Sequence, residues 1–238
     1  MIKNKSGIWI TGASSGIGKA AAKEFARTGC NVFASSRRQT ELDRLQKELS
    51  EENLALNIFP CNVASSANVE QTVKKISAAG EINCLINNAG ITSFKNAEQN
   101  SVQEITDIVN TNLLGSIYAI KYLLPIFIKQ GSGTIINVLS VVTQKVFTKS
   151  SAYAASKMGL LGYSQALREE VRKYNIRVIN IIPGATSTPI WSSDVREKFS
   201  DRMMTPENIA QLMVWAYLHP ENLVIEEIVV KPIQGDLS

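Results

Sequence analysis

Short apolar runs alternate with amphipathic segments along the whole chain, and this alternation restricts the fold more than any other feature. The apolar runs lie at residues 7–11, 31–35, 54–59, 84–87, 134–139, 177–182 and 224–231. Apolar residues recur at helical spacing between them, at residues 17–28, 40–50, 67–78, 102–129, 152–174 and 206–218. Strands that are apolar throughout are typical of a parallel sheet covered on both faces. We therefore predict an α/β fold, a doubly wound parallel seven-stranded sheet of the Rossmann type with helices on both faces.

Length and charge limit the domain number and the partners. The 238 residues, 45% of them hydrophobic, suffice for one substantial core, and no repeat, low-complexity tract or Pro/Gly-rich linker divides them, so residues 1–238 are predicted to form a single domain. The net charge of +4 contains no run of five like charges, which does not favour nucleic-acid binding. We also expect no membrane span, because no apolar stretch approaches about 18–20 residues. With the first strand beginning by Gly7, we expect no signal peptide.

The few cysteines and the single histidine limit the kinds of catalytic and metal site that the chain can form. Cys30, Cys61 and Cys84 are scattered without metal-ligand spacing, which is typical of reduced thiols in a cytoplasmic protein. The chain has a single histidine, His219, so a His-based catalytic triad or a multi-His metal site is hard to build. We therefore expect chemistry that needs no metal.

A glycine-rich stretch follows the first apolar run and opens the first helical segment, the context that a dinucleotide-binding turn requires. Glycines at such positions permit a tight turn, close approach of the backbone to a pyrophosphate and close helix packing. The helix N-terminus then offers free amides and a partial positive charge to phosphates. An ordinary Gly-rich strand–helix turn is the alternative. The residues assigned here to a cofactor are Gly12, Ser14, Ser15, Gly16, Ile17 and Gly18.

The end of the second apolar run predicts which dinucleotide is bound. An acidic residue about 20 positions past the glycines would hold the ribose 2′-hydroxyl of NAD, but the chain has Ser36, Arg37 and Arg38 there. Nothing at these positions repels a 2′-phosphate, and a guanidinium can bind one in a bidentate manner. We therefore predict NADP(H), with Arg37 as the phosphate ligand. For Arg38, a role as a solvated loop charge is equally compatible with the sequence.

Tyr153 and Lys157 lie four residues apart in a helical segment, which places the phenol and the ammonium on one face, one turn apart. An unperturbed tyrosine has a pKa near ~10, and a close cation favours its phenolate and lowers that pKa. Ser140 follows an apolar run, so its hydroxyl is expected at the carboxyl end of a strand, where open α/β sheets bind ligands. A surface Tyr/Lys pair is the alternative reading, and the other motifs argue against it.

Taken together and in this order, the glycine stretch, the run Asn87–Gly90, Asn112, Ser140, the Tyr153/Lys157 pair and Pro183–Gly184 resemble the short-chain dehydrogenase/reductase family. The resemblance covers essentially the whole chain and is to the small NADP-dependent carbonyl reductases of that family. It implies the strand order 3-2-1-4-5-6-7. It also implies a dimer seam from the two long helical segments, with the last strand allowing a tetramer; the apolar residues assigned to the seam are Leu113, Leu114, Ile117, Leu160, Leu161 and Leu167.

Further site residues are assigned by the resemblance alone. Asn112 matches the asparagine that holds a water linking the catalytic lysine to solvent. Asn62 stands where the family usually has an aspartate against the adenine, so the charge of that contact is missing here. The remaining cofactor-lining positions are Val63, Asn88, Ala89, Gly90, Tyr153, Lys157, Pro183, Gly184 and Thr188.

The function implied by these roles is reduction of a carbonyl to a secondary alcohol, or the reverse. NADPH delivers a hydride, Tyr153 gives a proton to the oxygen, Ser140 orients it, and Lys157 lowers the tyrosine pKa and holds the nicotinamide ribose. The substrate is expected to contact residues 92–96, 141–151 and 185–205. The last of these segments forms either a mobile lid or a short helix packed on the sheet. Two alternatives stay open, a 3-oxoacyl-(acyl-carrier-protein) reductase and a catalytically silent NADP-binding regulatory protein.

Overall fold

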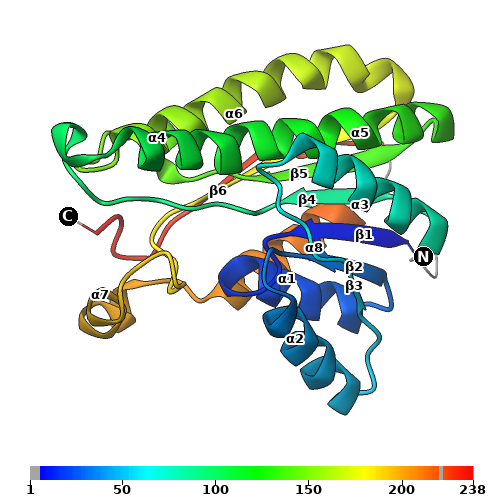
Figure 1. Ribbon diagram of the computed structural model, residues 1–238, viewed down its shortest axis with the longest axis horizontal. Helices are drawn as coiled ribbons and strands as arrows, with labels where there is room; N and C mark the ends of the chain where they lie inside the picture. Colours follow the sequence, from blue (N-terminus) through cyan, green and yellow to red (C-terminus); the bar gives the residue numbers. More distant parts are fainter. Residues whose placement is uncertain (1–5, 220–221, 238) are drawn as a thin grey trace.

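The computed structural model describes residues 6–219 and 222–237 and shows one parallel sheet between two layers of helices (Figure 1). The strands are β1 Gly7–Thr11, β2 Asn31–Ser35, β3 Asn57–Ile58, β4 Cys84–Asn87, β5 Gly133–Val138, β6 Ile176–Pro183 and β7 Glu227–Val230. The helices are α1 Gly16–Arg27, α2 Gln39–Glu51, α3 Ser66–Ala79, α4 Val102–Val109, α5 Gly115–Gln130, α6 Ser151–Val171, α7 Ser193–Lys198 and α8 Pro206–Leu218.

The seven strands are all parallel and run in the order β3-β2-β1-β4-β5-β6-β7, which confirms the predicted topology. The strand order reverses between β1 and β4. In doubly wound sheets this switch point is where ligands bind.

Two apolar layers hold the helices to the sheet. Buried side chains of α1, α2 and α8 pack on one face, and those of α3, α5 and α6 on the other. The strand side chains alternate between these layers, with Ile8 and Ile10 on the first and Trp9 on the second. Because both faces are covered, the strands have no polar face, which is the apolar pattern seen in the sequence.

The helical stretch Val102–Gln130 agrees with the predicted 102–129. It runs through α4, a π-helical turn at Asn110–Leu114, and α5. By length and composition alone this stretch could cross a membrane, so the expectation that no apolar segment approaches that length is wrong. Core helices of soluble proteins pass the same test, and here Ala119, Leu123 and Phe127 pack into the core against the sheet.

Three predicted boundaries differ from the structure. β3 has two ladder residues where six were predicted; it is an edge strand, and beyond it the Phe59 and Cys61 N–H groups still donate to the Ala34 and Ser36 carbonyls. α6 ends at Val171, after which a 3-10 turn leads to Asn175 in the left-handed conformation (φ 55°). β7 is confined to Glu227–Val230 within the predicted 224–231.

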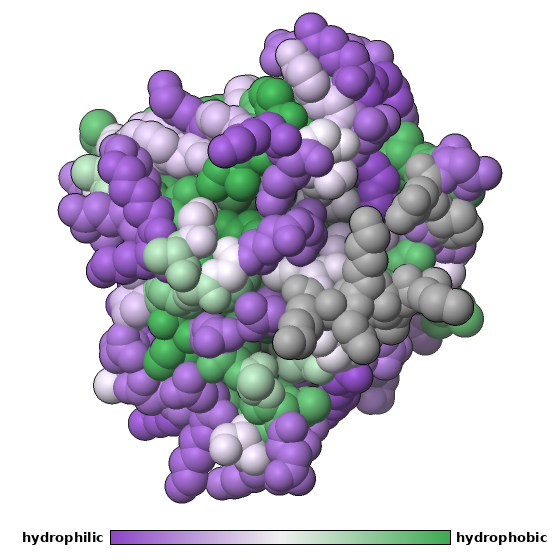
Figure 2. Space-filling view, turned by 90° about the vertical axis from the view of Figure 1, so that its right-hand side faces the viewer, coloured by the Kyte–Doolittle hydropathy of each residue, from purple (hydrophilic) through white to green (hydrophobic). Residues whose placement is uncertain are grey.

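The segment of residues 185–205, called the lid segment below, contains the short helix α7, which stands away from the sheet beside the carboxyl ends of the strands (Figure 1). Figure 2 views the molecule from the side that carries the N-terminus, where polar and apolar side chains are interspersed.

Candidate active site

Tyr153 and Ser140 meet at the carboxyl edge of the sheet. Ser140 lies two residues after the end of β5, at the start of a 3-10 turn, and its Oγ accepts a hydrogen bond from the Val142 N–H (3.3 Å). Tyr153 lies in the first turn of α6, is 9% exposed, and its phenol lies near the Ser140 side chain. Burial raises the pKa of Tyr153 to about 12, while the nearby Ser140 hydroxyl acts in the opposite direction. The phenol is therefore protonated at neutral pH.

Lys157 lies one turn further along α6 and is 4% exposed. Its Nζ donates a hydrogen bond to the Val138 carbonyl oxygen (2.6 Å) and lies 5.8 Å from the centroid of the Tyr153 ring. Burial of the ammonium lowers the pKa of Lys157 to about 8. The sequence predicts that Lys157 lowers the tyrosine pKa. In this structure burial has the larger effect, because the ammonium is directed at the Val138 carbonyl.

Asn112 lies in the π-helical turn and is completely buried. Its Nδ2 donates to the Ile91 carbonyl (2.9 Å) and to Ser156 Oγ (3.0 Å), while its Oδ1 accepts from the Ile91 N–H (2.8 Å). Ser156 Oγ in turn donates to the Tyr153 carbonyl oxygen (2.7 Å). Asn112 thus joins the loop after β4 to the turn of α6 that carries Tyr153.

The loop after β4 closes the site from the other side. A Cβ atom built on Gly90 would lie 3.7 Å from Lys157 Nζ and 3.5 Å from Asn112 Oδ1. Gly90 therefore sits against both groups, and the predicted residues Asn112, Tyr153 and Lys157 do come together around one point. Sequence reasoning missed Ser156 and Ile91, whose roles depend on contacts between distant segments.

The glycine-rich turn after β1 packs against the same loop. Gly12 has φ +67°, and a Cβ there would lie 2.7 Å from the Ala89 Cα. A Cβ on Gly18 would overlap Asn88 Nδ2, which donates to the carbonyl oxygens of Thr11 and Gly12 (3.1 Å each). Glycine is thus required at both positions for the turn to approach Asn88.

The N-terminus of α1 fits a phosphate group. The N-cap residue Ser15 makes no side-chain capping bond, and none of the first-turn residues is acidic. The first amides of the helix therefore remain available to an anion at the positive end of the helix dipole. Gly16 (φ +52°) lies against Thr188, because a Cβ on Gly16 would be 3.0 Å from the threonine side chain. The lid segment thereby borders the phosphate end of the cleft.

The arginines after β2 are placed differently from one another. Both arginines are exposed, but Arg38 Nη2 donates to Ser14 Oγ (3.3 Å), which brings its guanidinium to the glycine-rich turn. Ser36 is buried, and its Oγ donates to the Arg38 carbonyl (3.3 Å). The geometry thus favours Arg38 over Arg37, which the sequence analysis preferred.

Asn62 and Val63 are neighbours with different surroundings. Asn62 is exposed, and its Oδ1 accepts from the Ala64 N–H (3.2 Å). Val63 is buried and packs on α5, since a Cβ on Gly115 would lie 2.8 Å from the valine Cγ2. Pro183 ends β6, and the Gly184 N–H donates to the Val230 carbonyl (2.8 Å), which places both beside the end of β7.

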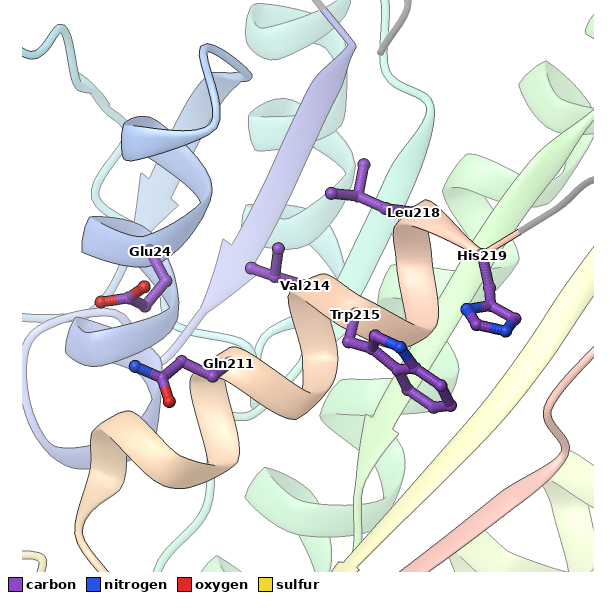
Figure 3. A pocket seen from close by; sticks show the side chains of 6 residues that line it. All are labelled: Glu24, Gln211, Val214, Trp215, Leu218 and His219. Carbon is purple, nitrogen blue, oxygen red and sulfur yellow. The ribbon is translucent and has the colours of Figure 1, made fainter. Parts of the chain in front are cut away.

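Two other features lie apart from this centre. A hollow of about 340 Å³ between α1 and α8 is lined by Glu24, Gln211, Val214, Trp215, Leu218 and His219 (Figure 3). Trp215 and His219 lie together on the last turn of α8, with ring centroids 4.3 Å apart. Within residues 6–219 and 222–237, no group of three or more His, Cys, Asp or Glu side chains is arranged to hold a metal ion.

Comparisons with known proteins agree with this geometry. The family model described as short chain dehydrogenase matches residues 7–198. Sepiapterin reductase of Chlorobaculum tepidum is 35% identical over 237 residues, covering 96% of this chain and 97% of that protein. A metagenomic short-chain oxidoreductase solved in complex with NADP superposes with a TM-score of 0.84 at 25% identity, covering 95% and 96% of the two chains. A variant of actinorhodin polyketide ketoreductase solved with NADPH gives 0.88 at 26% identity, covering 96% of each.

Proposed function

The chain belongs to the short-chain dehydrogenase/reductase family and is an NADP(H)-dependent oxidoreductase, and we propose that it reduces a ketone to a secondary alcohol with Tyr153 as the proton donor. The observation that carries the proposal is the buried Tyr153 phenol near the Ser140 hydroxyl, with the buried Lys157 ammonium one helical turn away. A protonated phenol at a strand end beside the dinucleotide cleft is what a carbonyl reductase requires.

The cofactor is held by the residues at the switch point. NADPH supplies the hydride when bound. The first-turn amides of α1 would bind its pyrophosphate, and the Arg38 guanidinium beside Ser14 would bind the 2′-phosphate. Lys157, next to Gly90, would hold the nicotinamide ribose.

The proton follows a short path through this chain's own side chains. Tyr153 donates its hydroxyl proton to the carbonyl oxygen, and Ser140 donates a hydrogen bond to the same oxygen as it gains negative charge. Lys157 stabilises the phenolate that is left. Lys157, one helical turn along α6, is the side chain that would return a proton to Tyr153.

A ketone attached to a flat ring system is the substrate class that the site supports best. Phe94, in the loop after β4, and Trp191, in the lid segment, stack with centroids 4.8 Å apart and an angle of 13° between their planes. Phe94 is 44% exposed, so the pair presents an accessible aromatic surface. Flat rings stack well on such a surface. The similarity to sepiapterin reductase, whose name denotes a pterin substrate, supports the same class.

The test is NADPH oxidation against a panel of sepiapterin, simple aryl ketones, aliphatic ketones and a 3-oxoacyl thioester. We expect turnover of ring-bearing ketones at a kcat/KM at least about tenfold above that of the aliphatic ones. Preferred turnover of the thioester would favour an acyl-carrier role instead. Tight NADPH binding without turnover of any compound would favour a regulatory, catalytically silent protein.

Assembly and location belong to the same proposal. A homodimer or homotetramer would use the outer faces of α5 and α6. Leu160 and Leu167, predicted for this seam, are buried in the chain's own core and cannot contribute, whereas Leu161 is only partly buried and Met158 is 55% exposed. The three cysteines are free and buried, in keeping with a reducing compartment, the cytoplasm.

A further inference from the structure

The segment that follows β7 turns back toward the site. The Gly184 N–H donates a hydrogen bond to the Val230 carbonyl oxygen (2.8 Å), so the segment begins beside the end of β6. Gly235, with φ +80°, donates its N–H to the Pro232 carbonyl (2.8 Å) and closes a turn that only glycine adopts easily. This C-terminal segment, residues 231–237, and α7 lie on the same side of the molecule (Figure 1).

Asp236, at the end of this turn, connects two segments that border the substrate. Its Oδ2 lies 3.1 Å from Lys231 Nζ and 3.7 Å from Lys145 Nζ, and Lys145 belongs to the loop between Ser140 and Tyr153. The Asp236 carbonyl oxygen accepts a hydrogen bond from Arg202 Nη2 (3.4 Å) in the lid segment. The carboxylate side chain is only 7% exposed, so these contacts are made largely out of water.

Two complementary polar atoms at this junction have no partner. Asp236 Oδ1 and Arg202 Nε are each buried and lack a hydrogen bond within the part of the chain that the structure describes. A buried donor or acceptor without a partner destabilises the arrangement that contains it. An arginine and a carboxylate pair most favourably through two parallel hydrogen bonds, and Arg202 already reaches the backbone of Asp236. A small movement of the lid segment toward the C-terminal segment would let Arg202 Nε donate to Asp236 Oδ1, so that both atoms gain a partner.

We propose that Arg202 and Asp236 form a clasp, in which the lid segment closes onto the C-terminal segment when Arg202 Nε pairs with Asp236 Oδ1. Asp236 is then a positioning residue: it holds the lid segment and the Lys145 loop together over the substrate without touching the reacting atoms. Only the link to catalysis rests on the proposed function; the closure itself does not.

Limited trypsin digestion of the full chain, saturated with NADP⁺, measures the closure directly. Lys198, on α7, is an exposed trypsin site in the lid segment. We expect Asp236→Asn and Arg202→Gln each to raise the cleavage rate after Lys198 by about tenfold, since each removes one charge-assisted partner. Because both changes break the same pair, the double variant should be cleaved no faster than either single variant.

Three comparisons complete the test. Asp201→Asn alters an exposed aspartate of the same segment whose Oδ1 bonds only to the adjacent Ser200, and it should leave the cleavage rate unchanged. Asp236→Glu should restore most of the protection. In NADPH oxidation, Asp236→Asn should raise KM for the ketone with little change in kcat or in NADPH affinity.

Unchanged cleavage in Asp236→Asn or Arg202→Gln, or effects that multiply in the double variant, would overturn the clasp. A wild-type protein that shows the clasp but turns over no carbonyl would instead contradict the proposed function and leave the clasp standing.

Discussion

The Lys157 ammonium donates a hydrogen bond to the Val138 carbonyl oxygen over 2.6 Å, and Val138 is the last residue of β5. The lysine is thereby held at the strand end that leads to Ser140, but in a place where water scarcely reaches it. Its ordinary solvation is replaced by one carbonyl, and its pKa falls to about 8. This places a change of charge within the working pH range of the enzyme.

The first prediction is the pH dependence of reduction. Loss of the Lys157 proton removes the cation that stabilises the Tyr153 phenolate, so kcat/KM for NADPH should fall about tenfold per pH unit above about pH 8. Tyr153 itself, with a pKa of about 12, stays protonated throughout. The Lys157→Arg variant keeps its positive charge, so its rate should be lower than that of the wild type but should not change with pH between pH 7 and 10. A wild-type rate that is flat between pH 7 and 10 would show that Lys157 does not titrate there.

The second prediction concerns stability. The Lys157 pKa is lower in the folded protein (about 8) than in the unfolded chain (10.5), so below pH 8 the buried charge destabilises the fold. Replacing it with a similar apolar side chain, Lys157→Met, should raise the free energy of unfolding by about 1–3 kcal/mol at pH 7 and abolish turnover. The difference should shrink as pH rises from about 8 to 10.5. Denaturant unfolding at several pH values measures it, and a destabilised variant at pH 7 would contradict the argument.

The third prediction concerns cofactor choice. Arg38→Ser should weaken NADPH binding by roughly 10- to 100-fold and leave NADH binding nearly unchanged, because a charge-assisted phosphate contact contributes about 1.5–3 kcal/mol. Arg37→Ser is the matched control at the neighbouring arginine, which makes no such contact with Ser14, and should have the smaller effect. Titration of both reduced cofactors decides the matter. Equal wild-type affinities for NADPH and NADH would mean that the end of β2 does not select the 2′-phosphate.

The fourth prediction concerns assembly. Met158 is exposed on α6 in the single chain, and a charge there would be buried in a symmetric contact of α5 and α6. Met158→Glu should therefore convert an oligomer to monomers in sedimentation at micromolar concentration. Val146→Glu, at a loop position that is 92% exposed, should sediment as the wild type does. If the wild-type protein sediments only as a monomer, the predicted contact between α5 and α6 of two subunits does not form.

The sequence predicted the fold because both of its determinants are local. Apolar runs such as that of β1 and helical spacing such as that of α8 are read within about a dozen residues, and the crossover rule then fixes a parallel sheet. The Tyr153/Lys157 pair was equally visible, since four residues make one helical turn.

What the sequence could not predict depends on distant segments meeting. The bond from Asn112 to Ser156 joins positions 44 residues apart, and the contact of Arg38 with Ser14 joins positions 24 apart. The direction of the Tyr153 pKa shift could not be predicted from the sequence either. A nearby cation lowers this pKa and burial raises it, and how deeply the phenol is buried decides which effect is larger.

Tyr153→Phe tests the central claim most directly, because it removes one hydroxyl and leaves the ring, the helix and the cofactor cleft in place. The measurements are kcat on the best ketone of the panel and the affinity for NADPH. A general acid of this kind contributes about 100-fold or more, so we expect kcat to fall at least that far while NADPH affinity stays within about twofold of the wild type. If the variant keeps more than about a tenth of the wild-type kcat, Tyr153 is not the proton donor.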